Sequence, residues 1–190
     1  MTEMAPVTNV PLPVKLRVED YMLLDEAGAF DAYGKTELLD GEVVYMNSQH
    51  RPHARVKSRL HIAIANALNG RDDGLEALVE AAIKVPPHNI PEPDIVVTAA
   101  ADGSGLIPLD SVRLIIEVSD TTLQSDLTRK AAIYARAGVP EYWVADVNAG
   151  VIHQLSDPDG SGYVRSRSIP FGERIAAATL PGFAVDTDRL

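Results

Sequence analysis

One apolar segment, LIIEVSD at residues 114–120, constrains the fold of this chain more than any other. Its apolar side chains and its two β-branched isoleucines predict a strand. Glu117 lies inside that strand, although a carboxylate is almost never fully buried unless it is paired or bound to a metal ion. The group that faces Glu117 is therefore the first question that the sequence raises about function.

Helical patterns precede and follow this strand. In residues 52–69, apolar residues recur at every fourth position between Pro52 near the start and Gly70 after the end, which predicts a helix. Further helices are predicted at 17–30, with Tyr21, Leu24 and Ala27 on one face, and at 124–138.

The remaining periodic segments predict strands. A hairpin is predicted at 36–46, because Asp40-Gly41 suits a tight turn between two short strands. Single strands are predicted at 75–85, 93–98, 111–119 and 141–147, and a meander at 150–180. This order indicates an α/β or α+β fold: one central mixed sheet flanked by helices, with an N-terminal helix and β-hairpin.

Length and composition favour one domain. The chain has 190 residues, of which 46% are hydrophobic, and we expect a proline-containing arm at 1–15 before a single domain at 16–190. The absence of cysteine excludes disulfides and thiolate metal sites. The N-terminus has no apolar signal core and no segment has the length of a membrane span, so a cytoplasmic protein without membrane contact is expected.

Charge is distributed unevenly along the chain. A net charge of −10 argues by itself against nucleic-acid binding, which requires basic surface. Residues 43–71 contain no acid and carry +5, which leaves −15 on the rest. The pattern predicts one basic face on an acidic body. The candidate nucleic-acid contacts on the 52–69 helix and at its start are Arg51, His53, Arg55, Lys57 and Arg59. A solvated helix face is the alternative.

Two carboxylates occupy consecutive predicted strands. If the strands are neighbours, Asp94 and Glu117 converge within about 5 Å on one face. Two bare carboxylates at that distance repel, and a divalent cation between them lets both stay ionised. Oxygen ligands suit Mg²⁺ or Mn²⁺. A turn cap by Asp94 and an ion pair of Glu117 with Lys130 or Arg113 are the structural alternatives.

Lys130 is the third candidate. Asp126, Lys130 and Tyr134 share one helix face, and if that face covers the strand ends, the ammonium reaches the carboxylates and can orient water or stabilise charge on a phosphate. An exposed Asp126–Lys130 pair is the alternative, and Tyr134 and Trp143 are expected in the core. No histidine has a second one at ligand spacing on its helix, so a histidine-based metal site is not expected. Glycine-rich phosphate loops and the GxSxG nucleophile motif are absent.

The ordered motifs resemble a known family. TELLDGEVVYM, HARVKSRL, PEPDIVV, LIIEVSD, DLTRKAAIYARAGVPEYWVADV and LPGFAVD are similar to the Uma-type family of restriction-endonuclease-like proteins, within the PD-(D/E)XK nuclease superfamily. The resemblance covers residues 17–188 and implies a restriction-endonuclease-like fold. It implies metal-ligand roles for Asp94 and Glu117 and a catalytic role for Lys130. The superfamily lysine usually stands two residues after the acid, where this chain has Ser119.

The resemblance also extends to other acids and to function. It implies that Glu37 completes the site directly or through water, with Glu80 a weaker candidate. The expected activity is Mg²⁺- or Mn²⁺-dependent hydrolysis of DNA phosphodiester bonds. The alternatives are a non-catalytic nucleic-acid- or protein-binding module on a nuclease scaffold, and hydrolysis of another phosphate ester. A homodimer is a candidate assembly, with 141–147 or the terminal meander pairing across a two-fold axis.

Overall fold

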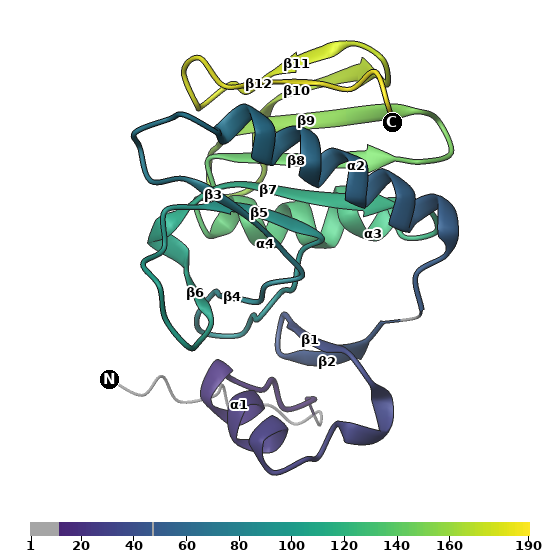
Figure 1. The fold of residues 1–190 in the computed structure, drawn as a ribbon. Helices are drawn as coiled ribbons and strands as arrows, with labels where there is room; N and C mark the ends of the chain where they lie inside the picture. The colour runs from purple at the N-terminus through teal and green to yellow at the C-terminus, as the bar shows by residue number, and fades with distance from the viewer. Residues whose placement is uncertain (1–11, 47) are drawn as a thin grey trace.

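The computed structural model describes residues 12–46 and 48–190. Its centre is a six-stranded sheet in the order β10-β9-β8-β7-β5-β3 (Figure 1). The strands of this sheet are β3 (Glu76–Val79), β5 (Ile95–Thr98), β7 (Val112–Ser119), β8 (Glu141–Asp146), β9 (Val151–Pro158) and β10 (Tyr163–Pro170). Strands β7 and β8 are parallel and the other neighbours are antiparallel, so the predicted mixed sheet is confirmed.

Helices cover both faces of this sheet. Helix α2 (Arg51–Leu68) lies across one face, and its buried residues are the predicted Val56, Leu60, Ile64 and Leu68 (Figure 1). The other face carries α3 (Leu123–Ser125), a π-helical turn η3 (Asp126–Lys130) and α4 (Ala131–Arg136). Because strand side chains alternate, β7 sends Ile116 to the α2 core and Ile115 to the α4 core.

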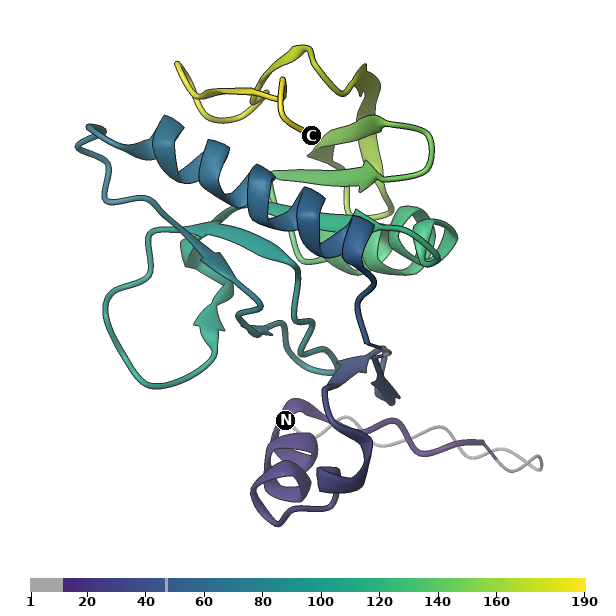
Figure 2. The same cartoon turned by 45° about the vertical axis from the view of Figure 1, so that its right-hand side comes forward.

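The N-terminal elements form a smaller layer beside the sheet. Figure 2 shows the hairpin of β1 (Thr36–Leu39) and β2 (Glu42–Tyr45) between the main body and α1 (Val18–Glu26), which is followed by η1 (Asp31–Tyr33). The predicted turn at Asp40-Gly41 is confirmed, and both residues have positive φ. The predicted apolar face of α1 is wrong in part, because Val18 and Tyr21 are buried whereas Leu24 and Ala27 are exposed.

The strand predictions at two places are corrected. The segment 75–85 divides into β3 and β4 (Ile83–Lys84), because Glu80 adopts a positive φ that ends the first strand; β4 pairs with β6 (Ile107–Pro108), which leads into η2 (Leu109–Ser111). The C-terminal meander ends after β10, since β11 (Arg174–Ala176) pairs with β12 (Ala184–Asp186) instead.

The proposed two-fold pairing through 141–147 is wrong. Strand β8 is hydrogen-bonded to β7 on one side and to β9 on the other, so neither of its edges is free. The outer strands of the main sheet are β10 and β3.

The predicted arm at 1–15 falls largely on residues 1–11, which lie outside the described residues, and the single domain at 16–190 stays a prediction. In the described ranges, no helix combines the length and apolarity that a membrane crossing needs.

Candidate active site

Strand pairing brings Asp94 and Glu117 together. Strands β5 and β7 are antiparallel with Ile95 opposite Ile116, so the same register continued by one residue sets Asp94 opposite Glu117. The Val118 N–H donates a hydrogen bond of 2.8 Å to Asp94 Oδ2, which fixes this carboxylate directly before the first residue of β5. Asp94 is 7% exposed and Glu117 is 5% exposed. Two acids therefore share one buried corner of the sheet.

Glu117 belongs to a buried group that we call the Glu117 cluster: Glu37, Glu117, Lys130 and Tyr134. Lys130 Nζ donates to Glu117 Oε1 at 2.9 Å and to Glu37 Oε1 at 3.1 Å, and the Tyr134 hydroxyl donates to Glu117 Oε1 at 3.1 Å. Glu37 comes from β1 and also accepts the Glu92 N–H at 2.6 Å. One ammonium thus stands between two carboxylates from distant parts of the chain.

Burial sets the electrostatics of this cluster. Removal from water raises the pKa of Glu117 well above its ordinary value, although the Lys130 ammonium opposes that change. Burial would lower the pKa of Lys130, but the charges of Glu117 and Glu37 outweigh it and raise that pKa. Burial likewise raises the pKa of Tyr134. The raised pKa favours the ammonium form of Lys130, which suits this residue to stabilising negative charge rather than to accepting a proton.

The π-helical turn η3 orients Lys130. Asp126, at its start, accepts hydrogen bonds from Ser119 Oγ at 2.7 Å and from Thr122 Oγ1 at 2.6 Å, so it is anchored to the end of β7. Lys130, at the end of the same turn, faces Glu117. The alternative of an exposed Asp126–Lys130 pair is wrong, because both residues are buried and contact other partners. Such turns occur frequently at functional sites.

A second group, the Asp94 cluster, consists of His53, Lys57, Glu80 and Asp94. His53 Nε2 lies 3.2 Å from Asp94 Oδ2, and Lys57 Nζ lies 3.5 Å from Asp94 Oδ1. Lys57 also pairs with Glu80, which pairs in turn with Lys35. Burial would raise the pKa of Asp94, but His53, the Val118 N–H and Lys57 hold it below its ordinary value. Hydrogen bonds from Lys35 and Lys57 lower the pKa of Glu80 to about 2.

The predicted basic surface is therefore split. His53 and Lys57, expected at a nucleic-acid interface, face Asp94 instead. Arg51, Arg55 and Arg59 are exposed along α2, and Arg59 Nη1 donates to the carbonyl of Arg189 at 2.5 Å. The sequence carried a signal for the first pair: a spacing of four residues puts His53 and Lys57 on one helix face, beside the buried Val56 and Leu60.

The donor atoms suit a hard divalent cation. Asp94 Oδ1 has only longer contacts, to Gln49 Nε2 at 3.3 Å and to Lys57 Nζ, and Glu117 Oε2 accepts no hydrogen bond from the described residues. Two carboxylates with retained waters are a common ligand set for Mg²⁺. Within residues 12–46 and 48–190, no three His, Asp or Glu side chains already converge on one point as ligands of an ion. The residues fit a cation held by two acids and water.

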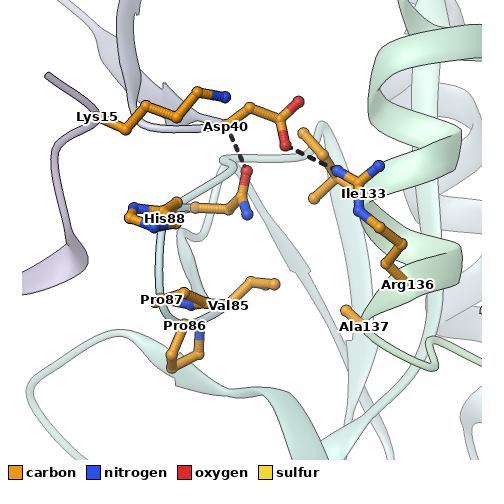
Figure 3. A pocket seen from close by; sticks show the side chains of 10 residues that line it. Lys15, Asp40, Val85, Pro86, Pro87, His88, Ile133, Arg136 and Ala137 are labelled. Carbon is orange, nitrogen blue, oxygen red and sulfur yellow. Dashed lines mark hydrogen bonds and ion pairs between the residues drawn. The ribbon is translucent and has the colours of Figure 1, made fainter. Parts of the chain in front are cut away.

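A cavity in another part of the molecule overlaps neither the Glu117 cluster nor the Asp94 cluster. This cavity of about 320 Å³ lies between the β1–β2 turn, residues 85–89 and α4. Figure 3 shows the side chains that line this cavity. It is lined by polar groups that include Lys15, Asp40, His88 and Arg136, and Arg136 Nη2 donates to Asp40 Oδ1 at 2.7 Å. This cavity contains none of the residues of the two acid clusters.

Comparison with known proteins gives the family of the chain and a similar fold. The family model Uma2, described as "Putative restriction endonuclease", matches residues 18–188. The chain belongs to the Uma2 family. Among solved structures, this Uma2 chain resembles a "putative nuclease belonging to DUF820 from Anabaena variabilis ATCC 29413", with a TM-score of 0.66 and 15% identity over 87% of this chain and 89% of that chain. At that identity the likeness concerns the fold, and it confirms the predicted nuclease-type architecture. No curated protein matches the chain.

Proposed function

We propose that this Uma2 protein is a divalent-metal-dependent endonuclease that hydrolyses DNA phosphodiester bonds. The observation that carries the proposal is the pair of buried carboxylates, Asp94 and Glu117, on adjacent strands of a nuclease-type fold, each with a lysine beside it. Burying charges is costly, and a site with no task for them would be expected to use apolar residues. Membership of a family described as "Putative restriction endonuclease" supports the same reaction class.

Asp94 and Glu117 would hold Mg²⁺ or Mn²⁺. When bound, the cation would polarise the scissile phosphate and make a water more acidic. Lys130 keeps its proton, so its role is to stabilise negative charge and to hold Glu117 and Glu37 in place. Tyr134 fixes the orientation of Glu117 through its hydroxyl. Glu37 positions Lys130, and its second oxygen is available to complete the cation's shell directly or through water.

The exposed arginines of α2 supply the DNA contacts in this proposal. Arg51, Arg55 and Arg59 recur at every fourth residue, so they form one stripe on the helix. Contacts of this kind reach phosphates and position the duplex without reading its sequence. The net charge of −10 repels DNA from the rest of the surface, which favours approach through this stripe alone.

The test is cleavage of supercoiled plasmid with Mg²⁺, Mn²⁺ or EDTA. We expect metal-dependent nicking by the wild type and its loss in Asp94→Asn, with Arg136→Gln on α4 as the active control. Lys130→Gln, checked for folding by circular dichroism, is expected to lose at least about 100-fold in rate, since one electrostatic group is worth roughly that much. Binding of DNA without cleavage in any metal would reject the proposal and favour a non-catalytic module.

A further inference from the structure

Tyr33 and Tyr45 place aromatic rings in water. Tyr33, in η1, is 58% exposed, and Tyr45, at the end of β2, is 64% exposed. The other Phe, Tyr and Trp side chains in residues 12–46 and 48–190 are buried or half-buried. The two ring centroids lie 6.2 Å apart, with an angle of 36° between the ring planes. Two separate elements thus bring two rings together at the surface, and we call them the tyrosine pair.

The fold makes little use of these two rings. Neither belongs to the hydrophobic clusters that form the core. The hydroxyls of the four other tyrosines each donate a hydrogen bond of 3.0 or 3.1 Å, namely those of Tyr21, Tyr134, Tyr142 and Tyr163. The hydroxyls of the tyrosine pair make no such bond to the described residues. Tyrosine is enriched at interfaces because its ring packs while its hydroxyl tolerates water, so the pair is suited to contact a partner.

The tyrosine pair adjoins the candidate active site through the hairpin. In the β1–β2 ladder, Glu37 of the Glu117 cluster is opposite Val44, the residue before Tyr45. Opposite residues lie about 5 Å apart and the rise along a strand is about 3.4 Å, so the backbones of Glu37 and Tyr45 lie within about 7 Å, with side chains on opposite faces of the hairpin. The next element along the chain is α2, on which the arginine stripe begins at Arg51 (Figure 1).

We propose that the tyrosine pair stacks on an unpaired base, and that the substrate is therefore DNA with unpaired bases beside the cleaved bond. The inference rests on the proposed function. Aromatic side chains stack on the faces of unpaired bases, whereas bases inside a duplex are stacked on one another. Every base has such a face, so this contact is independent of sequence, as are the phosphate contacts of α2. A duplex on the arginine stripe and an unpaired strand at the tyrosine pair describe a junction between double-stranded and single-stranded DNA.

The test is binding of the full chain to fluorescent DNA hairpins in EDTA, measured by anisotropy. One hairpin is blunt, one carries a single-stranded tail of thymidines, and one carries an equal tail of abasic nucleotides. We expect the wild type to bind the thymidine tail at least about fivefold more tightly than the abasic tail, since stacking of one base on an aromatic side chain contributes at least that factor. The two tails carry the same phosphate charge, so the comparison isolates the bases.

Paired substitutions assign the effect to the two rings. Tyr33→Leu with Tyr45→Leu is expected to lose the preference for the thymidine tail at an unchanged log–log salt slope, because stacking neutralises no phosphate. Tyr33→Phe with Tyr45→Phe should keep the preference, because the ring alone is required. Leu23→Ala with Val164→Ala removes apolar side chains of similar exposure, 69% and 63%, and is the matched control that should behave as the wild type.

The outcomes separate this inference from the proposed function. Equal binding of the thymidine and abasic tails by the wild type overturns the stacking role even if the leucine variant does not fold, and it leaves a protein partner as the alternative occupant. A preference that persists in a folded leucine variant overturns it as well. Metal-dependent nicking of plasmid in either case leaves the nuclease standing. A preference that the leucine variant loses, in a protein that cleaves with no metal, supports the stacking contact and rejects the nuclease.

Discussion

At the scale of single residues, Lys130 is the group on which the Glu117 cluster depends. Its removal leaves Glu37 and Glu117 as buried carboxylates without a cation, a change that typically costs about 3–5 kcal/mol. We expect Lys130→Met to lower the free energy of unfolding by about that amount near pH 7. The loss should shrink near pH 5, because burial raises the pKa of Glu117 and a protonated Glu117 needs no cation beside it. Urea unfolding at both pH values measures it.

A surface pair on the same helix provides the control. Arg136 pairs with Asp40, its side chain is 49% exposed, and exposed pairs contribute about 0–1 kcal/mol. Arg136→Met should therefore have a small effect at either pH. Equal losses for the two variants would mean that Lys130 is not the buried cation described above.

Glu80 gives a separate prediction for acid stability. Its pKa is about 2 in the folded protein because of Lys35 and Lys57, and it is near 4.5 when unperturbed. A lowered carboxyl pKa stabilises the fold above the unfolded value, and the benefit is lost as the pH falls through the folded value. We expect Glu80→Gln to be less stable than the wild type near pH 6, and equally stable near pH 2. Urea titrations across that range test this, with the exposed Glu76→Gln on β3 as the control variant.

At the scale of elements, the β1–β2 turn packs closely against the backbone at Lys15. Gly41 has φ +79°, and a Cβ added there would lie 2.6 Å from Lys15 Cβ, whose backbone runs beside the turn. Gly34 also has positive φ, at +71°, but an added Cβ would meet nothing within 4 Å. We expect Gly41→Ala to be more destabilising than Gly34→Ala by at least about 1 kcal/mol, because overpacking adds to the backbone strain that both share. Thermal unfolding measures the difference. Equal decreases in Tm for the two variants would contradict the close approach of Gly41 to Lys15.

The exposed arginines of α2 lead to a prediction about the salt dependence of DNA binding. Reversing two of these charges in Arg55→Glu with Arg59→Glu removes two phosphate contacts in the proposed complex. We expect weaker binding by similar factors on unrelated sequences, and a log–log salt slope shallower by roughly 2, since each contact contributes about 0.9. Fluorescence anisotropy at several salt concentrations measures the slope. Lys15→Glu with Arg136→Glu, at the cavity of Figure 3, is the charge-matched control; an equal change there would remove α2 from the interface.

Elements with strong periodicity could be predicted from the sequence, and long-range contacts could not. The four-residue repeat of apolar side chains in α2 and the Asp40-Gly41 turn are determined by residues close together in the chain. Both could therefore be recognised from the sequence. The π-helical turn depends on the hydrogen bonds that Asp126 accepts from Ser119 and Thr122. The periodicity of the sequence does not predict these contacts. The contact of His53 with Asp94 depends on where α2 begins relative to β5. Candidate acids could thus be named from sequence, whereas their partners required the fold.

At the scale of the whole molecule, the site joins parts of the chain that would otherwise be separate. Glu37 belongs to the N-terminal layer, His53 and Lys57 to α2, Asp94 and Glu117 to the sheet, and Lys130 to the opposite helical layer. Each of these parts contributes a charged or titratable side chain to the Asp94 cluster or the Glu117 cluster. A cation held by Asp94 and Glu117, as proposed, would bind the folded chain only, so it should stabilise the fold against unfolding.

Metal binding is therefore expected to appear as thermal stability. At a free Mn²⁺ concentration about 100-fold above the dissociation constant, a ligand specific for the folded state contributes about 2.7 kcal/mol. For a chain of this size that corresponds to a rise in Tm of roughly 5–10 °C. Asp94→Asn should unfold at the same temperature with and without Mn²⁺, whereas Asp110→Asn, which removes an acid that belongs to neither cluster, should respond as the wild type. A rise that persists in Asp94→Asn would place the stabilising ion elsewhere, because the proposed site loses one of its two carboxylate ligands in that variant.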